Sequence, residues 1–294
     1  MYARNYVGKW PSPQLTFMFL WGASLIIGWH PLFDTFKLAL GDYEYTHLLL
    51  ILPISTALIV LEWRSLTLMM VANVRAGSTL VAIAVLIGAF VAMSSGSFSA
   101  DVRLSIEMFA LVLSWIGVFV CCFGFRISRE VLFPLCFLFG VVPFPHFVTN
   151  EIVRRLQQGS TLAAHGLFAA VGVPVAQNGF MLTIPGLTVE VAKECSSIRS
   201  SSMLLVTAMV LAQLVLRSPW RKALVIAIAL PLSVAKNGLR IFTIAMLATR
   251  VDPAYLTGKL HRQGGIVFFA IALIGIFLLL WILQRRENVP HHQI

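Results

Sequence analysis

Three side chains of different chemistry stand out in three separate hydrophobic regions of this sequence. They are the thiol of Cys195, the guanidinium of Arg240 and the imidazole of His261. A thiolate can attack a carbonyl and form a thioester, an imidazole can donate and accept the protons of such a reaction, and a guanidinium can stabilise the oxyanion. The chemistry that uses all three together is nucleophilic acyl transfer.

Cys195 differs from the other cysteines in its surroundings. It lies in ECSSIRSS, just before an apolar run. The other three lie within such runs and are interpreted as small buried hydrophobes: Cys121, Cys122 and Cys136. A helix N-terminus favours the thiolate form, and the cation of Arg199, one helical turn on, acts in the same direction. The local sequence fits a helix cap equally well, with Ser196 and Ser197 closing the helix and Arg199 snorkelling.

Arg240 lies well inside the apolar run ALVIAIALPLSVAKNGLRIFTIAMLA, four residues after Lys236. A charge within a membrane span costs about 2.5–3.5 kcal/mol and usually faces an interior cavity. Pro231 and the Asn237-Gly238 pair weaken the helix just before it and favour a kink. We expect a functional Arg240 supported by Asn237, with snorkelling or pairing with an acid as the alternative.

His261 lies in TGKLHRQGGIVFF, just before the last apolar run. By itself, a histidine in this position is most often an interfacial anchor. The other histidines show no metal-ligand spacing, so we expect neither a zinc site nor a cofactor. They are His30, His47, His146, His165, His291 and His292.

The composition indicates the elements that must position these residues. The chain is 59% hydrophobic and 12% charged, with a mean hydropathy of +0.87. Its apolar residues come in long runs, which predicts an all-α polytopic membrane protein; β-barrel strands would alternate instead. The net charge of +10 comes from basic residues that flank apolar runs. No basic stretch is interleaved with aromatic residues, so we expect no nucleic-acid partner.

We predict about eight transmembrane helices, near residues 15–33, 46–62, 79–95, 104–123, 130–146, 196–217, 222–249 and 263–284. With the N-terminus in the cytoplasm, half of the 22 basic residues fall on short cytoplasmic segments. They are Arg4, Lys9, Arg64, Arg75, Arg126, Arg129, Arg217, Arg221, Lys222, Arg285 and Arg286. This bias predicts cytoplasmic N- and C-termini in the cytoplasmic (inner) membrane. Cys195, Arg240 and His261 then share the extracytoplasmic face.

The segment 147–194 does not fit a plain helical bundle. It begins with an amphipathic helical pattern, and its runs MLTI and LTVEV around Pro185-Gly186, after the Asn178-Gly179 turn signal, predict a small β-hairpin. We expect an extracytoplasmic cap of an amphipathic helix and a hairpin that leads into Cys195. Residues 1–294 then form a single integral membrane domain, with the catalytic core helices in 195–294.

These motifs resemble the exosortase/archaeosortase family of membrane transpeptidases. The family pattern is a C-[SA]-G-[IL]-R-S-like motif, an N-x-x-R motif and a downstream histidine. Here ECSSIRSS, NGLRI and His261 follow in that order, and the resemblance covers about 130–294. Ser197 stands where the family usually has glycine.

The resemblance implies that Cys195, Arg240 and His261 are catalytic. It also implies membrane-anchored substrate proteins with a C-terminal sorting signal: a short motif such as PEP, a transmembrane helix and a basic tail. One rival hypothesis is a non-catalytic carrier or assembly factor for lipid or polysaccharide that binds an anionic group at Lys236 and Arg240. Another is a peptidase that uses water alone. The oligomeric state is not predicted by the sequence.

Overall fold

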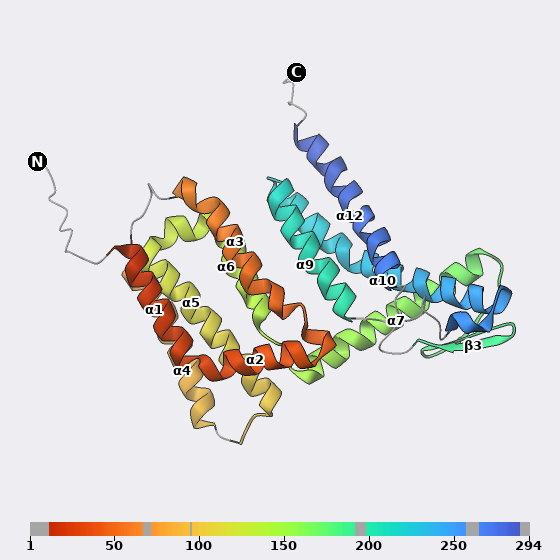
Figure 1. Cartoon of the computed structure of the whole chain (residues 1–294), viewed down its shortest axis with the longest axis horizontal. Coiled ribbons are helices and arrows are strands. Elements are labelled where there is room, and N and C mark those ends of the chain that lie inside the picture. Colours follow the sequence, from red (N-terminus) through yellow and green to blue (C-terminus); the bar gives the residue numbers. More distant parts are fainter. Residues whose placement is uncertain (1–11, 67–71, 95, 192–197, 257–264, 289–294) are drawn as a thin grey trace, which may run out of the picture. The chain divides into compact units, whose positions relative to one another are not determined.

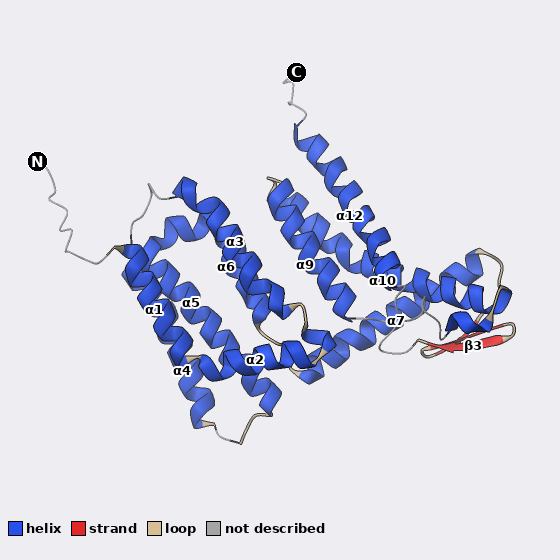
Figure 2. Cartoon of the chain, in the orientation of Figure 1, coloured by secondary structure: helices blue, strands red, loops and turns tan. Residues whose placement is uncertain are grey.

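The computed structural model describes residues 12–66, 72–94, 96–191, 198–256 and 265–288 (Figure 1). The described chain is mostly helical, with one small β-sheet (Figure 2). It packs as two compact units, residues 1–146 and 147–294. The division falls at the residue where the sequence predicts the cap segment to begin.

The first unit is built around the largely buried helix α5 (Ala100–Glu130). Its other elements are α1 (Pro13–Ile27), α2 (Trp29–Gly41), η1 (Tyr43–Tyr45), α3 (Leu48–Leu66), α4 (Val74–Met93), α6 (Leu132–Phe137) and η3 (Leu138–Val141). α4 and α5 approach closely at Gly77 and Gly117, where an added side chain would collide with the facing helix. Small residues commonly allow membrane helices to pack in this way. Gly124, with φ 83°, interrupts α5 at the point where the predicted 104–123 span ends.

Within the described residues, six helices are long and apolar enough to cross a membrane. They correspond to six of the eight predicted spans. The other two predicted spans, 15–33 and 130–146, each fall on a bent helix pair, and the chain has eight spans if each pair crosses the membrane as one broken span. The bends are 72° between α1 and α2, and 100° between 132–141 and 146–170. Proline explains both bends, since Pro31 has no N–H to continue α1 and Pro143 and Pro145 lie within the second bend. The chain is therefore a multi-pass helical membrane protein.

The second unit contains a bundle of three long helices. They are α9 (Ile198–Val215), α10 (Pro219–Arg250) and α12 (Gly265–Asn288), with η4 (Pro253–Leu256) after α10. Small and branched apolar residues such as Ala208, Ala229 and Ile276 fill the space between the helices. At one end, the Glu287 carboxylate accepts hydrogen bonds from the backbone N–H groups of Arg217 (3.0 Å) and Ser218 (2.9 Å). This carboxylate ties the end of α12 to the turn between α9 and α10.

The rest of the second unit is α7 (His146–Ala170) and an antiparallel sheet in the order β1 (Ala176–Asn178), β2 (Met181–Ile184), β3 (Leu187–Glu190). The predicted amphipathic helix and both predicted strands are present. β1 is an additional strand, so the sheet has three strands rather than the two of a hairpin. Gly179 (φ 60°) and Gly186 (φ 84°) supply the left-handed backbone of the two strand turns. One face of the sheet packs on α7 and α10, which brings β3 beside Arg240.

Candidate active site

The structure describes three of the seven predicted site residues. Arg199 is exposed in the first turn of α9, Asn237 is buried on α10, and Arg240 is half-buried one turn further along α10. The other four lie outside the described residues: Cys195, Ser196, Ser197 and His261. The convergence of thiol, guanidinium and imidazole therefore stays a prediction.

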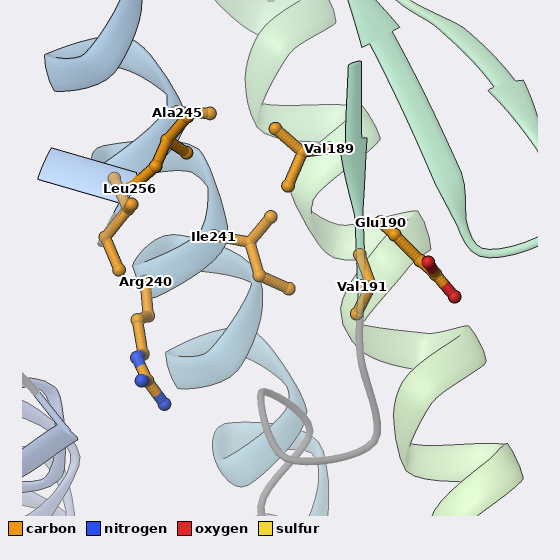
Figure 3. A pocket seen from close by; sticks show the side chains of 8 residues that line it. Val189, Glu190, Val191, Arg240, Ile241, Ala245 and Leu256 are labelled. Atoms are coloured by element: carbon orange, nitrogen blue, oxygen red, sulfur yellow. The ribbon is translucent and has the colours of Figure 1, made fainter. Parts of the chain in front are cut away.

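Arg240 lines a pocket between α10 and β3, whose empty volume of about 370 Å³ includes space open to solvent. The residues that line it are Val189, Glu190, Val191, Arg240, Ile241, Ile244, Ala245 and Leu256. Figure 3 shows Val189 and Ile241 pointing toward each other, with Glu190 directed away from α10. The walls are thus aliphatic, and Arg240 supplies a cation at one end.

The chain segments that contain Cys195 and His261 both adjoin this pocket at described residues. Val191, four residues before Cys195, and Leu256, five residues before His261, line the pocket with Arg240. On the far side of His261, a Cβ added to Gly265 would lie 4.0 Å from Nη1 of Arg240. Four residues of extended chain span at most roughly 14 Å. Along the chain, Cys195 is thus only four residues from this pocket, and His261 is only five residues from it.

A buried polar network joins the first turns of α9 to α10. The Lys236 ammonium donates to Oγ of Ser200 at 2.5 Å, and Ser233 Oγ donates to Ser201 Oγ at 2.7 Å. Lys236 is only 6% exposed, and its Nζ lies 6.0 Å from the ring centroid of Phe269 on α12. Lys236 is one helical turn from Arg240, so the network fixes the start of α9 close to it. No role was predicted for these serines, although Ser200 and Ser201 end the ECSSIRSS motif and Ser233 shares a helix face with Lys236.

α7 supports α10 and the end of β3. Residue 238 faces α7 so closely that a Cβ on Gly238 would lie 2.5 Å from the Cβ of Ala163. The buried Gln157 amide donates to the carbonyl oxygen of Val191 at 2.5 Å. α10 is assigned as one helix that contains Pro231, and Gly238, which was predicted to favour a kink, also allows close packing of α10 on α7. Gln157, which the sequence analysis also missed, holds the last described residue before the Cys195 segment.

The described part of the chain contains no group of three or more His, Cys, Asp or Glu side chains that could hold a metal ion. The charged residues that line the pocket are Arg240 and Glu190, whose carboxylate is directed away from α10, and the amide of Gln157 and the hydroxyl of Ser200 lie on the supporting elements. This set can bind a carbonyl oxygen or an anion and can position a peptide backbone. Acyl transfer would need the thiol and the imidazole to be supplied by the adjoining segments.

A family model described as transmembrane exosortase matches residues 39–278, which is well over half of the chain. The match extends from α2 into α12 and includes Cys195, Arg240 and His261. No curated protein and no solved structure matches the chain.

Proposed function

Because the chain belongs to the transmembrane exosortase family, we propose that it is a membrane cysteine transpeptidase that cleaves the C-terminal sorting signals of exported proteins. The substrates carry a short motif, a transmembrane helix and a basic tail. The active site is at the extracytoplasmic face of the cytoplasmic membrane, with both termini of the chain in the cytoplasm. The charge bias of the short loops supports this orientation.

In the proposed reaction, the Cys195 thiolate attacks the scissile carbonyl carbon and forms a tetrahedral oxyanion. Arg240 stabilises this oxyanion, a role worth about 3–4 kcal/mol in comparable sites. His261 protonates the leaving amine, so the C–N bond breaks and a thioester remains. His261 then takes a proton from an incoming amine or water, which attacks the thioester and releases the thiolate.

The single observation that supports this assignment best is the position of Arg240. Its pocket is lined by residues that lead directly into both segments expected to carry its partners, at Val191 and Leu256. The amphipathic helix and sheet in 150–194 support a second role, as a lid that excludes water from the thioester. β3 contributes two of the pocket-lining residues, Val189 and Glu190, and Val191 directly follows it, which fits such a covering position.

The carrier hypothesis is less well supported. It requires Lys236 and Arg240 to bind one anionic group together. Lys236 is buried, donates to Ser200 and does not line the pocket of Arg240. An anion that entered this pocket would therefore meet the guanidinium without the ammonium. A carrier also has no need of a thiol in the position of Cys195.

The test is replacement of Cys195 by alanine in the native host, followed by mass spectrometry of the C-termini of exported proteins. We expect Cys195→Ala to accumulate at the wild-type level while proteins that retain their C-terminal helix and basic tail build up. Cys136→Ala is the matched control, because Cys136, which was predicted to be buried, is instead a free, exposed cysteine on α6. Normal C-termini in the Cys195→Ala strain would refute the nucleophile assignment.

A further inference from the structure

β3 has an open edge beside the Arg240 pocket. Within the described chain it pairs with β2 alone. The Val191 N–H donates to the Phe180 carbonyl at 2.9 Å, which extends the β2–β3 register by one hydrogen-bonded pair. Hydrogen-bonded and non-bonded pairs alternate in an antiparallel ladder. The backbone N–H and C=O groups of Thr188 and Glu190 therefore point away from β2, toward the open edge.

A second contact supports this assignment of the ladder. The Thr188 hydroxyl donates to the Thr183 hydroxyl at 3.3 Å, and these two residues are register partners. Facing side chains are closest in non-bonded pairs. Thr188 is thus in a non-bonded pair with β2, and its backbone groups are directed to the opposite side.

The pocket lies on one side of this edge. Val189 and Val191 both line the pocket, and Figure 3 shows Val189 facing Ile241 of α10. An extended peptide alternates its side chains between two faces. A peptide that paired with β3 would therefore direct every second side chain toward α10 and the aliphatic pocket. The empty volume of about 370 Å³ includes space open to solvent, so the enclosed part of the pocket is smaller and admits only a small side chain.

We propose that the substrate's extracytoplasmic juxtamembrane peptide adds as a fourth strand to the open edge of β3, with one small aliphatic side chain in the Arg240 pocket. This inference rests on the proposed function and names how that site selects its substrate. In strand addition, main-chain hydrogen bonds supply affinity, and pockets for alternate side chains supply specificity. Val191, which directly follows β3, is four residues before Cys195 in the sequence, so the proposed fourth strand is within a short stretch of chain of the thiol.

The pocket is tested by filling it with a larger side chain at Leu256. Leu256 is half-buried on η4 and lines the pocket, while its neighbour Tyr255 is half-buried and does not. In the native host, we expect Leu256→Trp to lower the ratio of processed to unprocessed C-termini at least tenfold, for the same exported proteins that accumulate in Cys195→Ala. Tyr255→Trp should process as the wild type does. Equal membrane levels and equal rates of Cys195 alkylation by iodoacetamide establish that both variants are folded.

The strand edge is tested by photo-crosslinking in the full-length Cys195→Ala chain, which retains unprocessed substrate. p-Benzoylphenylalanine replaces Thr188 on the open edge of β3 or, as the matched control, Ala176 on β1 at the other side of the sheet. We expect adducts at position 188 whose peptides map to the juxtamembrane segment of a retained protein, and none of these at position 176. Adducts at 188 with lipid alone, or with a second copy of this chain, would overturn strand addition.

The experiments distinguish failure of the proposed function from failure of the strand-addition proposal. If Cys195→Ala leaves every C-terminus processed, the proposed function is wrong and the strand proposal falls with it. If Cys195→Ala blocks processing while Leu256→Trp processes normally, only the pocket assignment is wrong. A blocked Leu256→Trp together with juxtamembrane adducts at position 188 supports both.

Discussion

Replacing Lys236 by methionine separates stability from function in the second unit. The substitution keeps the length of the side chain and removes its charge. It deletes the hydrogen bond to Ser200, and interhelical hydrogen bonds in membranes contribute about 0.6–1.7 kcal/mol. It also removes a cation from within a span, where a charge costs about 2.5–3.5 kcal/mol. The cost of the buried charge that is removed exceeds the hydrogen-bond energy that is lost. We therefore expect Lys236→Met to raise the free energy of unfolding by about 1–3 kcal/mol.

We expect the same variant to lose activity, because the first turn of α9 is then held to α10 by the Ser233–Ser201 hydrogen bond without the Lys236–Ser200 bond nearer Arg240. A misplacement of about 1 Å can cost on the order of a hundredfold in rate. Stability is measured by SDS-induced unfolding in mixed micelles, and activity by the processed fraction of exported proteins in the native host. The matched control is Lys222→Met, since Lys222 joins the same two helices near the start of α10 by donating to Gln213 at 2.7 Å. Lys222→Met should leave processing unchanged.

Two results would count against this reasoning. Unchanged processing by Lys236→Met would show that the start of α9 needs no ammonium to hold it. A loss of more than about 2 kcal/mol of stability would show that the hydrogen bond outweighs the cost of the buried charge.

Three further predictions concern the candidate site. The alkylation of Cys195 by iodoacetamide should saturate with a midpoint below the ordinary thiol value of ~8.5, because a lowered pKa gives the thiolate at lower pH; an ordinary midpoint would contradict activation. Both Arg240→Gln and Arg240→Lys should reduce processing about 10²–10³-fold, since lysine keeps the charge and loses the planar fork, whereas exposed Arg250→Gln should have no effect. Gly238→Val should lower the free energy of unfolding by about 1–3 kcal/mol by colliding with α7, while Gly275→Ala, whose Cβ would meet α10 at an ordinary 3.5 Å, should be tolerated in the same SDS titration.

Apolar runs and turn residues made most of the helical fold predictable. Long hydrophobic segments located the helices that could span the membrane, and Asn178-Gly179 located a strand turn. The two bent helix pairs were harder to predict, because a hydropathy pattern does not show where a helix changes direction. Pro31 was visible within the predicted first span, and its missing N–H was the local signal for the first bend. β1 has only three residues, too short to show an alternating pattern.

The candidate site likewise contains residues that the sequence could predict and residues that it could not. Arg240 was found because a charge in an apolar run is conspicuous without any structure. Ser200, Ser233 and Gln157 were missed, because each acquires its role only from the register of one helix against another element. Single polar residues on a helix do not reveal that register. Gly238 was noticed, and its tight packing against α7 depends on the same kind of information.

Glu287 gives the bundle of α9, α10 and α12 a mechanical asymmetry. Its carboxylate binds the turn at residues 217–218 and lies 3.5 Å from Nη1 of Arg221, so the bundle is fastened where α10 begins. Arg240 is 19 residues beyond Arg221, or roughly 30 Å along the helix axis. At that lever arm, pivoting α10 by roughly 10° about the fastened end would shift Arg240 by about 5 Å. The Lys236–Ser200 hydrogen bond, one helical turn from Arg240, opposes such a rotation and so keeps the guanidinium at the pocket.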